Sequence, residues 1–457
     1  MGAGLLVLFA GRTASGAGPL GPEGTPIQTS AYGVDLFQGP VLATTRITGL
    51  AGAFTAIAEG TEGIAWNPTA ASVRPAFSTT RDDYDLTIGV TLPASVKDTD
   101  FDNDGRSGFA YDRFVWATFG GMLQHDALGF GVIASFQNYE LGLPGTVPVV
   151  IPGTGEEVTS VIVRMLRFDP VVSYALLHEQ VHFGVGLRVA SFFGVGATGP
   201  NDGEKAERML MSANTAGVQT GLLWAPRVTS LRVGFTARTP AVPLGKVEGR
   251  IPPNAQGDRV VGTLYLPRRL ELPWELEGGF AVQLWKRHFN LRWTNEDKVP
   301  PEEAEPHRRT LKNGQREPSW RGARRLLKAR HAALPRERVL LSTSVLLSGP
   351  VKNAVGWESM LAQTVQRSGE RASLTVRAGV EAEVLPTWLV LRGGSYLEPT
   401  RFRSAKARVH GTGGFDLRVL ESAVFGLYDE GTRFRISGAV DAARDYFGWS
   451  IGAGLFR

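Results

Sequence analysis

Four aspartates between residues 98 and 104 form the sharpest chemical motif of the sequence. They alternate with other residues in DTDFDNDG: Asp98, Asp100, Asp102 and Asp104. Alternate carboxylates followed by Gly105 match the start of a calcium-binding loop, where they converge on a hard cation. Tyr111 stands where an EF-hand has its closing glutamate, and strands are expected on both sides. The motif therefore indicates either a calcium site of another kind or a solvated acidic surface loop.

The segment 141–153 (LGLPGTVPVVIPG) is a second candidate for binding, because it is apolar for a loop. Its branched side chains have no obvious core to enter: Val147, Val149, Val150 and Ile151. Exposed apolar loops often form ligand-binding surfaces. The alternative is an extension of two strands that packs on neighbouring loops.

Composition favours a binding or transport protein over an enzyme. The chain of 457 residues has no cysteine, which excludes disulfides and thiolate metal sites. It contains no phosphate-binding loop. The net charge of +5 is small for this length and gives no reason to expect nucleic acid as a partner. We expect no enzymatic activity and no cofactor other than calcium.

From about residue 77 onward, apolar residues alternate with polar residues or glycine. In residues 181–189 one face is wholly apolar, and the same holds in residues 231–238 and 374–384. Such alternation predicts strands with two unlike faces. Fifteen segments fit, of which 288–296 is the weakest. Because a bacterial barrel with both ends on one side needs an even number of strands, we demote that segment and predict fourteen.

A soluble β-sandwich would show the same alternation, but two features favour a transmembrane antiparallel up-and-down β-barrel. Many strands run ten residues or more, which exceeds the usual soluble length. Short turns predicted at residues 120–126, 178–180 and 386–387 alternate with long loops. Charged residues on the polar faces would then line the lumen: Arg188, Arg232, Arg238, Arg377, Arg433, Arg435, Glu381, Glu383 and Asp441.

The segment 46–73 (RITGLAGAFTAIAEGTEGIAWNPTAASV) differs from the strands. Apolar residues at helical spacing predict a first short helix: Leu50, Phe54, Ile57 and Ala58. Asn67 is a good N-cap and Pro68 suits the first helical position, which predicts a second. Two small helices cannot stand alone, so we expect the barrel to enclose them.

This segment resembles the hatch of the FadL/TodX family, outer-membrane barrels that import long-chain fatty acids and aromatic hydrocarbons. The motif GxAGAFTAxAE…WNP carries the resemblance through Gly49, Gly52, Ala53, Phe54, Ala58, Glu59, Trp66, Asn67 and Pro68. Thr69 departs from the usual alanine after Asn-Pro. The resemblance implies a small helical hatch inside the lumen, fourteen strands and location in the outer membrane of a Gram-negative bacterium.

The resulting domain plan has three parts. Residues 1–17 look like a partial signal peptide, since an apolar run precedes small residues. Residues 18–76 would form an N-terminal extension and the hatch. Residues 77–457 would form the barrel, interrupted at 286–337 by a charged insertion on the periplasmic side. Residues 320–330 of that insertion could form a helix.

The sequence supports one function and one alternative. The first is passive uptake of hydrophobic molecules, such as long-chain fatty acids, by a monomer set among outer-membrane lipid and lipopolysaccharide. The alternative is a barrel that transports nothing and docks exported or periplasmic partner proteins. From residue 296 to 338, twelve lysines and arginines against seven acidic residues could anchor an anionic partner, or could belong to a solvated, partly helical linker.

Overall fold

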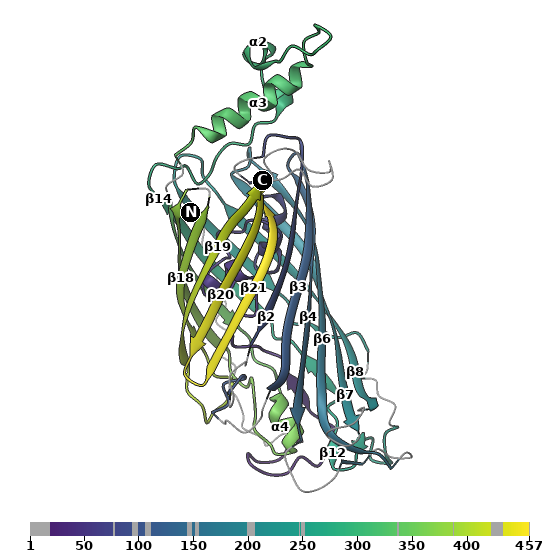
Figure 1. Ribbon diagram of the computed structural model, residues 1–457. Helices are drawn as coiled ribbons and strands as arrows, with labels where there is room; N and C mark the ends of the chain where they lie inside the picture. The colour runs from purple at the N-terminus through teal and green to yellow at the C-terminus, as the bar shows by residue number, and fades with distance from the viewer. Residues whose placement is uncertain are drawn as a thin grey trace, which may run out of the picture.

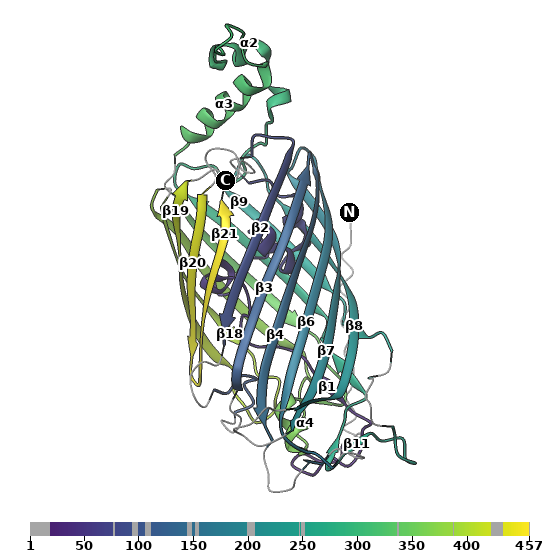
Figure 2. The ribbon, with the colours of Figure 1, turned by 45° about the vertical axis from the view of Figure 1, so that its right-hand side comes forward.

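The computed structural model describes residues 19–75, 78–93, 99–105, 111–143, 149–150, 155–198, 206–245, 247, 252–335, 338–386, 388–421 and 433–456. Its main sheet has sixteen strands, fourteen of which close on themselves as an antiparallel barrel. Figures 1 and 2 show these strands tilted around a common axis. The predicted fourteen-stranded, all-β fold is confirmed.

Each barrel strand pairs with its neighbours in sequence, and the ring closes where the first strand meets the last, with Thr87 opposite Gly454. The strands are β2 (Asp82–Leu92), β3 (Tyr111–His125), β4 (Leu128–Gly142), β6 (Glu157–Leu176), β7 (Val181–Thr198), β8 (Ala206–Trp224), β9 (Leu231–Arg238), β14 (Glu275–Leu284), β15 (Val339–Ser348), β17 (Ser373–Leu385), β18 (Leu389–Glu398), β19 (Arg408–Glu421), β20 (Arg433–Ala443) and β21 (Tyr446–Phe456).

Most connections at one rim of the barrel are short, and most at the other are long loops, although β20 and β21 are joined at the long-loop rim by Arg444 and Asp445 alone. β6 and β7 are joined through residues 177–180, and the turn between β3 and β4 lies at Asp126 and Ala127. The predicted turn at residues 120–126 is wrong, because β3 continues to His125. Glycine at position 120 marks a close approach instead: a Cβ there would lie 2.8 Å from the Thr61 side chain inside the barrel.

The demotion of segment 288–296 agrees with the structure, in which these residues form no strand. Phe289 is buried under the short-turn rim, where the Arg232 guanidinium lies 3.9 Å from the centre of its ring. The chain therefore leaves the barrel after β14 and returns at β15. Among the described residues, no helix is long and apolar enough to span a membrane.

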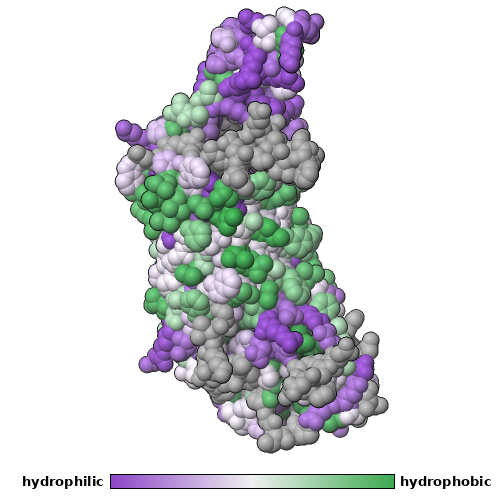
Figure 3. Space-filling view, in the orientation of Figure 1, coloured by the Kyte–Doolittle hydropathy of each residue, from purple (hydrophilic) through white to green (hydrophobic). Residues whose placement is uncertain are grey.

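The apolar faces of the strands point outward. Ile88, Phe119 and Ile451 are more than half exposed, while the alternating positions are buried in the lumen. Figure 3 shows the resulting hydrophobic surface around the middle of the barrel, between hydrophilic ends. Exposed aromatic residues mark the short-turn rim: Tyr174, Trp224, Trp285 and Trp388. This distribution is the reverse of that in a soluble protein.

The hatch segment, residues 46–73, lies inside the barrel and is largely buried. It contains α1 (Thr45–Gly49), η1 (Thr61–Ala65) and η2 (Pro68–Ser72). The predicted first helix through residues 50–58 is wrong. Ala51, Gly52 and Ala58 have positive φ, so α1 stops after one turn and the chain continues as a series of turns. Packing against the wall fixes this path against the helical periodicity.

The N-terminal extension before the hatch fills the lumen toward the long-loop rim. Its β1 (Gly33–Asp35) pairs in parallel with β13 (Arg269–Glu271) and β16 (Ala354–Val355), which belong to two long loops. β5 (Val149–Val150), β10 (Val242–Pro243), β11 (Val260–Val261), β12 (Leu264–Tyr265) and α4 (Trp357–Ala362) complete this region. Residues 1–18, including the predicted signal peptide, lie outside the described residues.

The insertion folds as a small helical unit beyond the short-turn rim (Figure 1). It consists of η3 (Glu296–Lys298), α2 (Pro301–Ala304), η4 (Glu305–His307) and α3 (Ser319–Ala332). Val299, Ala304, Ala323 and Leu327 form its own buried apolar cluster. The helix predicted at residues 320–330 corresponds to α3.

Candidate functional site

Glycines on the inner wall let the hatch segment approach the strands closely. A Cβ on Gly234 would lie 2.3 Å from the Thr55 carbonyl oxygen, and one on Gly129 would lie 1.8 Å from that of Ala71. Since real Cβ atoms do not come closer than 3.0 Å, the hatch backbone occupies the space of the missing side chains. The hatch backbone comes similarly close at Gly184 and Gly379, and hatch side chains do so at Gly120, Gly131, Gly221 and Gly394. The glycine faces of the strands therefore match the shape of the hatch segment.

Asn67 holds the second half of the hatch together. It is the N-cap of η2, its Oδ1 accepts a hydrogen bond from the Thr69 backbone nitrogen at 3.1 Å, and Pro68 follows at the first helical position. Its Nδ2 donates to the Thr55 carbonyl at 2.9 Å. Because Asn67 is fully buried, both hydrogen bonds satisfy groups that water cannot reach.

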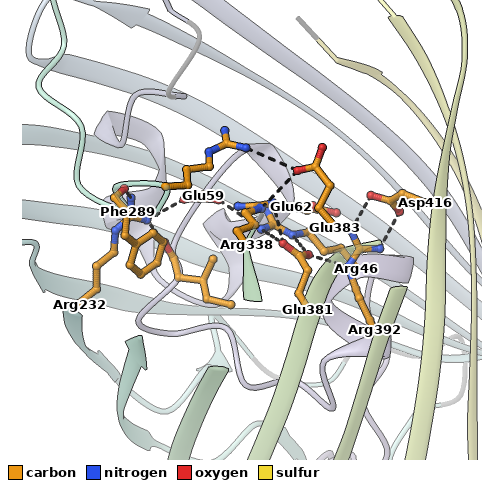
Figure 4. A network of polar contacts seen from close by, with 12 residues as sticks. Arg46, Glu59, Glu62, Arg232, Phe289, Arg338, Glu381, Glu383, Arg392 and Asp416 are labelled. Carbon is orange, nitrogen blue, oxygen red and sulfur yellow. Dashed lines mark hydrogen bonds and ion pairs between the residues drawn. The ribbon is translucent and has the colours of Figure 1, made fainter. Parts of the chain in front are cut away.

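A buried ionic network fastens the hatch to the wall; we call it the polar latch (Figure 4). Arg46 of α1 pairs with Glu381 of β17 at 2.9 Å and with Glu59 of the hatch at 3.2 Å. Arg232 of β9, three strands away from β17 in the ring, reaches Glu59 at 2.9 Å. Figure 4 shows Arg46 between Glu381 and the Arg392–Asp416 pair. The latch consists of Arg46, Glu59, Arg232, Arg338, Glu381, Arg392 and Asp416.

Removing any one partner of the latch destabilises the fold by more than the intact latch stabilises it. Desolvating two ions costs roughly what their attraction returns, whereas removing one partner of a buried pair typically costs about 3–5 kcal/mol. Glu381 is fully buried between Arg46, Arg338 and Arg392, so its charge depends on all three. Hatch and wall are thus held in one relative position.

A cavity of about 130 Å³ lies between the hatch and the N-terminal extension; we call it the loop-side cavity. Phe37 and Val41 of the extension and Trp66 of the hatch line it, with Trp116 and Met165 from the wall. Charged residues line its other side and pair with one another, as Arg238 and Glu275 do at 3.2 Å. The cavity is therefore half apolar and half ionic.

A second cavity, of about 160 Å³, lies between the hatch and the short-turn rim; we call it the turn-side cavity. Arg46, Glu59 and Arg392 of the polar latch line it, together with His288 and Phe289 from the segment after β14. The hatch and its latch therefore lie between two cavities, each lined by both apolar and charged residues.

The hatch residues predicted from the sequence lie where hatch and wall meet. Gly49 contacts Gly414 of β19, and Gly52 abuts Arg377 of β17. Ala53 and Phe54 are fully buried, and the Trp66 indole donates to the Gly52 carbonyl at 3.0 Å. The sequence analysis missed Arg46 as the centre of the latch. A lone arginine opening a small-residue segment was the available signal, because such a charge needs a buried partner.

The structure divides the predicted apolar-loop residues. Val149 is buried and pairs with Val158 as part of β5, which extends the ladder of β6. Val150 pairs with Glu157 and stays partly exposed. Val147 and Ile151 lie outside the described residues. For the described pair, strand extension accounts for the apolar character without a ligand.

The acidic loop is not the solvated surface loop offered as one alternative. Asp100 and Asp104 are buried, and the carboxylate oxygens of Asp102 are shielded from solvent. Asp98 lies outside the described residues. Phe101 explains the burial, because its ring packs on Phe114, with centroids 4.7 Å apart, and pulls the loop into the apolar core.

Two pentapeptides match the letters of hydrolase motifs, and neither has the required geometry. HEQVH, residues 178–182, lies in the turn between β6 and β7, with His178 and Glu179 at positive φ, whereas the metalloprotease motif needs a helix. GWSIG, residues 448–452, lies within strand β21 and not at a strand-to-helix elbow. Both belong to the wall.

The barrel has an apolar exterior, exposed aromatics at one rim, and a lumen filled by ion pairs and a plug. Only a bilayer makes an apolar outer band favourable on a closed sheet. The chain is an outer-membrane β-barrel. The short turns and the insertion then face the periplasm, and the long loops face outside.

Comparison with solved structures returns barrels of similar size. A FadL homologue of Pseudomonas aeruginosa matches at 11% identity, with 94% of this chain and 99% of that chain covered and a TM-score of 0.49. The toluene transporter TbuX of Ralstonia pickettii matches at 11% identity over 91% and 97%, with a TM-score of 0.48. The toluene transporter TodX of P. putida matches at 11% identity over 91% and 98%, with a TM-score of 0.48.

These are proteins of the FadL/TodX type that the hatch motif resembles. No protein-family model and no curated protein sequence matches the chain. The fold of this chain rests on its own strand pairing and outer surface.

The insertion pairs much of its basic charge internally. Arg324 pairs with Glu296 at 3.1 Å, Arg325 pairs with Glu317, and Arg330 reaches Glu303 at 2.6 Å. Trp320 is exposed beneath the guanidinium groups of neighbouring arginines. The charge run thus forms a helical surface in which much of the basic charge is paired.

Proposed function

We propose that this barrel lets hydrophobic molecules cross the outer membrane passively, with the loop-side cavity as their binding site. The observation that carries the proposal is the position of this cavity. It lies inside a closed wall, between the N-terminal extension on the outside and the latched hatch on the periplasmic side. An apolar solute held there is beyond the polar outer leaflet and has one barrier left to pass.

The size of the cavity favours a small ligand. An apolar cavity of roughly 150 Å³ is known to hold benzene, so about 130 Å³ suits a single ring or a short chain. Trp66, Trp116 and Phe37 offer aromatic faces for such a ring. A long-chain fatty acid, which the family resemblance implies, would need the extension or the hatch to move before it could enter whole.

The test is to fill the cavity without touching the latch. Ser135 lines the loop-side cavity from β4, whereas Val132 of the same strand faces the lipid side. We expect Ser135→Phe to weaken binding of a small aromatic probe by at least about tenfold, while Val132→Phe leaves it unchanged. Quenching of tryptophan fluorescence in purified barrel measures the affinity, and heat-modifiable gel migration checks folding. Equal affinity in both variants would remove this cavity from the pathway.

The alternative function keeps one observation in its favour. The helical insertion carries its own apolar cluster and an exposed Trp320 at the periplasmic rim, as a docking module would. Mass spectrometry of small molecules extracted with the barrel would support uptake. A periplasmic protein captured by the whole chain, and lost when residues 300–335 are replaced by a short linker, would support docking.

A further inference from the structure

Three carboxylates of the acidic loop converge in a buried place at the extracellular end. One oxygen each from Asp100, Asp102 and Asp104 lies within 4.8 Å of the others. Ligands about 2.3–2.6 Å from one Ca²⁺ ion are separated by distances of this order. Asp100 shapes the loop by accepting hydrogen bonds from the backbone nitrogens of Asp104 and Gly105 at 3.0 and 3.1 Å.

Within the described residues, Asp102 is the member of the cluster whose carboxylate is left without a partner. Both of its carboxylate oxygens are buried without a hydrogen-bond partner in the described part of the chain. Arg408 donates to the Asp100 backbone carbonyl at 2.6 Å, but its guanidinium pairs with Glu398.

Two residues from a different loop lie beside the cluster. Glu358 of α4 is almost fully buried, and the Tyr111 hydroxyl donates to its Oε1 at 2.8 Å. Gln366 is equally buried; its amide lies against Asp104, 3.4 Å from the backbone oxygen, and its Oε1 has no hydrogen-bond partner among the described residues. An unpartnered buried amide oxygen beside buried carboxylates is a set of donors that suits a hard cation.

We propose that Asp100, Asp102 and Asp104, with Glu358 and the amide of Gln366, form a Ca²⁺ site that joins the β2–β3 loop to α4. Only oxygen donors are present, which suits a hard cation. The donors come from two loops in no regular arrangement, and calcium accepts irregular coordination by six to eight oxygens, whereas magnesium demands a near-ideal octahedron.

The site would act as a clamp on the extracellular cap. Phe101 and Tyr111 flank the aspartates and pack in the buried apolar cluster that also contains Val34 of the N-terminal extension. On the other loop, Gly356 lies against Asp102 and the Phe402 ring. Calcium would therefore hold the β2–β3 loop and α4 together over the N-terminal extension. This inference concerns the cap and stands whether or not the barrel transports anything.

Terbium luminescence tests the site directly, because Tyr111 and Trp357 line the same small cavity as Asp102 and can sensitise a bound lanthanide. With the whole chain in detergent, we expect saturable Tb³⁺ emission that about 1 mM Ca²⁺ displaces, in line with the affinities of extracellular calcium modules. Asp102→Asn and Glu358→Gln should each weaken Tb³⁺ binding at least about tenfold. Glu207→Gln, which removes an exposed carboxylate paired with Arg164, should change nothing.

Three results would overturn the proposal. Wild-type protein could show no saturable emission, emission could be equal in all variants, or Mg²⁺ could displace Tb³⁺ as well as Ca²⁺ does. If Asp102→Asn and Glu358→Gln do not give heat-modifiable barrels, the proposal is tested on the wild-type protein alone, by its melting temperature. Its melting temperature should then rise by several degrees between excess chelator and millimolar Ca²⁺, and an unchanged melting temperature counts against the site.

Discussion

Asn67 offers the cleanest test of the hatch at the level of one residue. Asn67→Ala removes the cap on Thr69 and the hydrogen bond to the Thr55 carbonyl. The lost cap costs roughly 0.5–2 kcal/mol, so amide exchange in residues 46–73 should quicken by between about twofold and thirtyfold. Exchange in the barrel strands should stay the same, because their ladders do not involve Asn67. Hydrogen exchange followed by mass spectrometry measures both.

The matched control is Asn214→Ala, which removes an exposed amide that bonds only to the Ser191 hydroxyl of the neighbouring strand. If both variants leave hatch exchange unchanged, the cap does not hold the hatch. The pair therefore separates a specific cap from a general effect of losing an asparagine.

At the level of single residues, the sequence predicts local chemistry. It does not predict which distant residues the fold brings into contact. The Asn67–Pro68 pair indicates a capped helix start from its own spacing, and the aspartate motif suggests a cation. Glu358, however, follows the motif by some 250 residues in sequence, and no period or spacing connects it with Asp102. Arg46 likewise finds Glu381 only because the barrel closes around the hatch.

At the level of elements, the inner-wall glycines lead to a sharper prediction. Gly234→Ala puts a methyl group 2.3 Å from the Thr55 oxygen and 2.7 Å from the Ala56 Cα. Strand β9 is paired on both sides, so the hatch must shift instead. Gly278→Ala on the neighbouring β14 is the control, because its nearest atom outside the adjacent residues lies 3.9 Å away.

Because the chain contains no cysteine, a single introduced cysteine can report directly on this prediction. In an Ala65→Cys background, a small thiol reagent should label the hatch faster when Gly234 is alanine than when Gly278 is alanine. Both proteins should remain heat-modifiable. Equal labelling rates would mean that hatch and wall are not in contact at Gly234.

Strands were predictable as elements because each barrel strand has one lipid face and one lumen face over its whole length. Parity then removed the spurious segment 288–296. The short helices were less predictable. Leu50, Phe54 and Ile57 have helical spacing, but positive φ at Ala51 and Gly52 breaks the helix where the hatch meets β17 and β18. Contacts with the wall decide that path, and they are absent from local sequence.

For the molecule as a whole, two segments lie in series inside the barrel. The hatch lies in the periplasmic half and is held by the polar latch. The N-terminal extension lies in the extracellular half, where β1 completes a small sheet with two long loops. The hatch motif predicts that the first segment is a plug. The glycine- and proline-rich sequence of the extension does not predict the second.

Single-channel conductance can distinguish one obstruction from two. Replacing residues 46–73 by a flexible linker of equal length should leave a heat-modifiable barrel, because the fourteen strand ladders do not include the hatch. Its conductance should stay small, since the extension remains between β13 and β16. Removing residues 19–73 should open a wide, poorly selective pore, because water then solvates the charges of the lumen. Replacing residues 300–335 is the control and should leave the barrel closed.

A wide pore after loss of the hatch alone would show that the extension does not seal the barrel. An unchanged conductance after loss of both segments would show that residues 19–73 are not the plug.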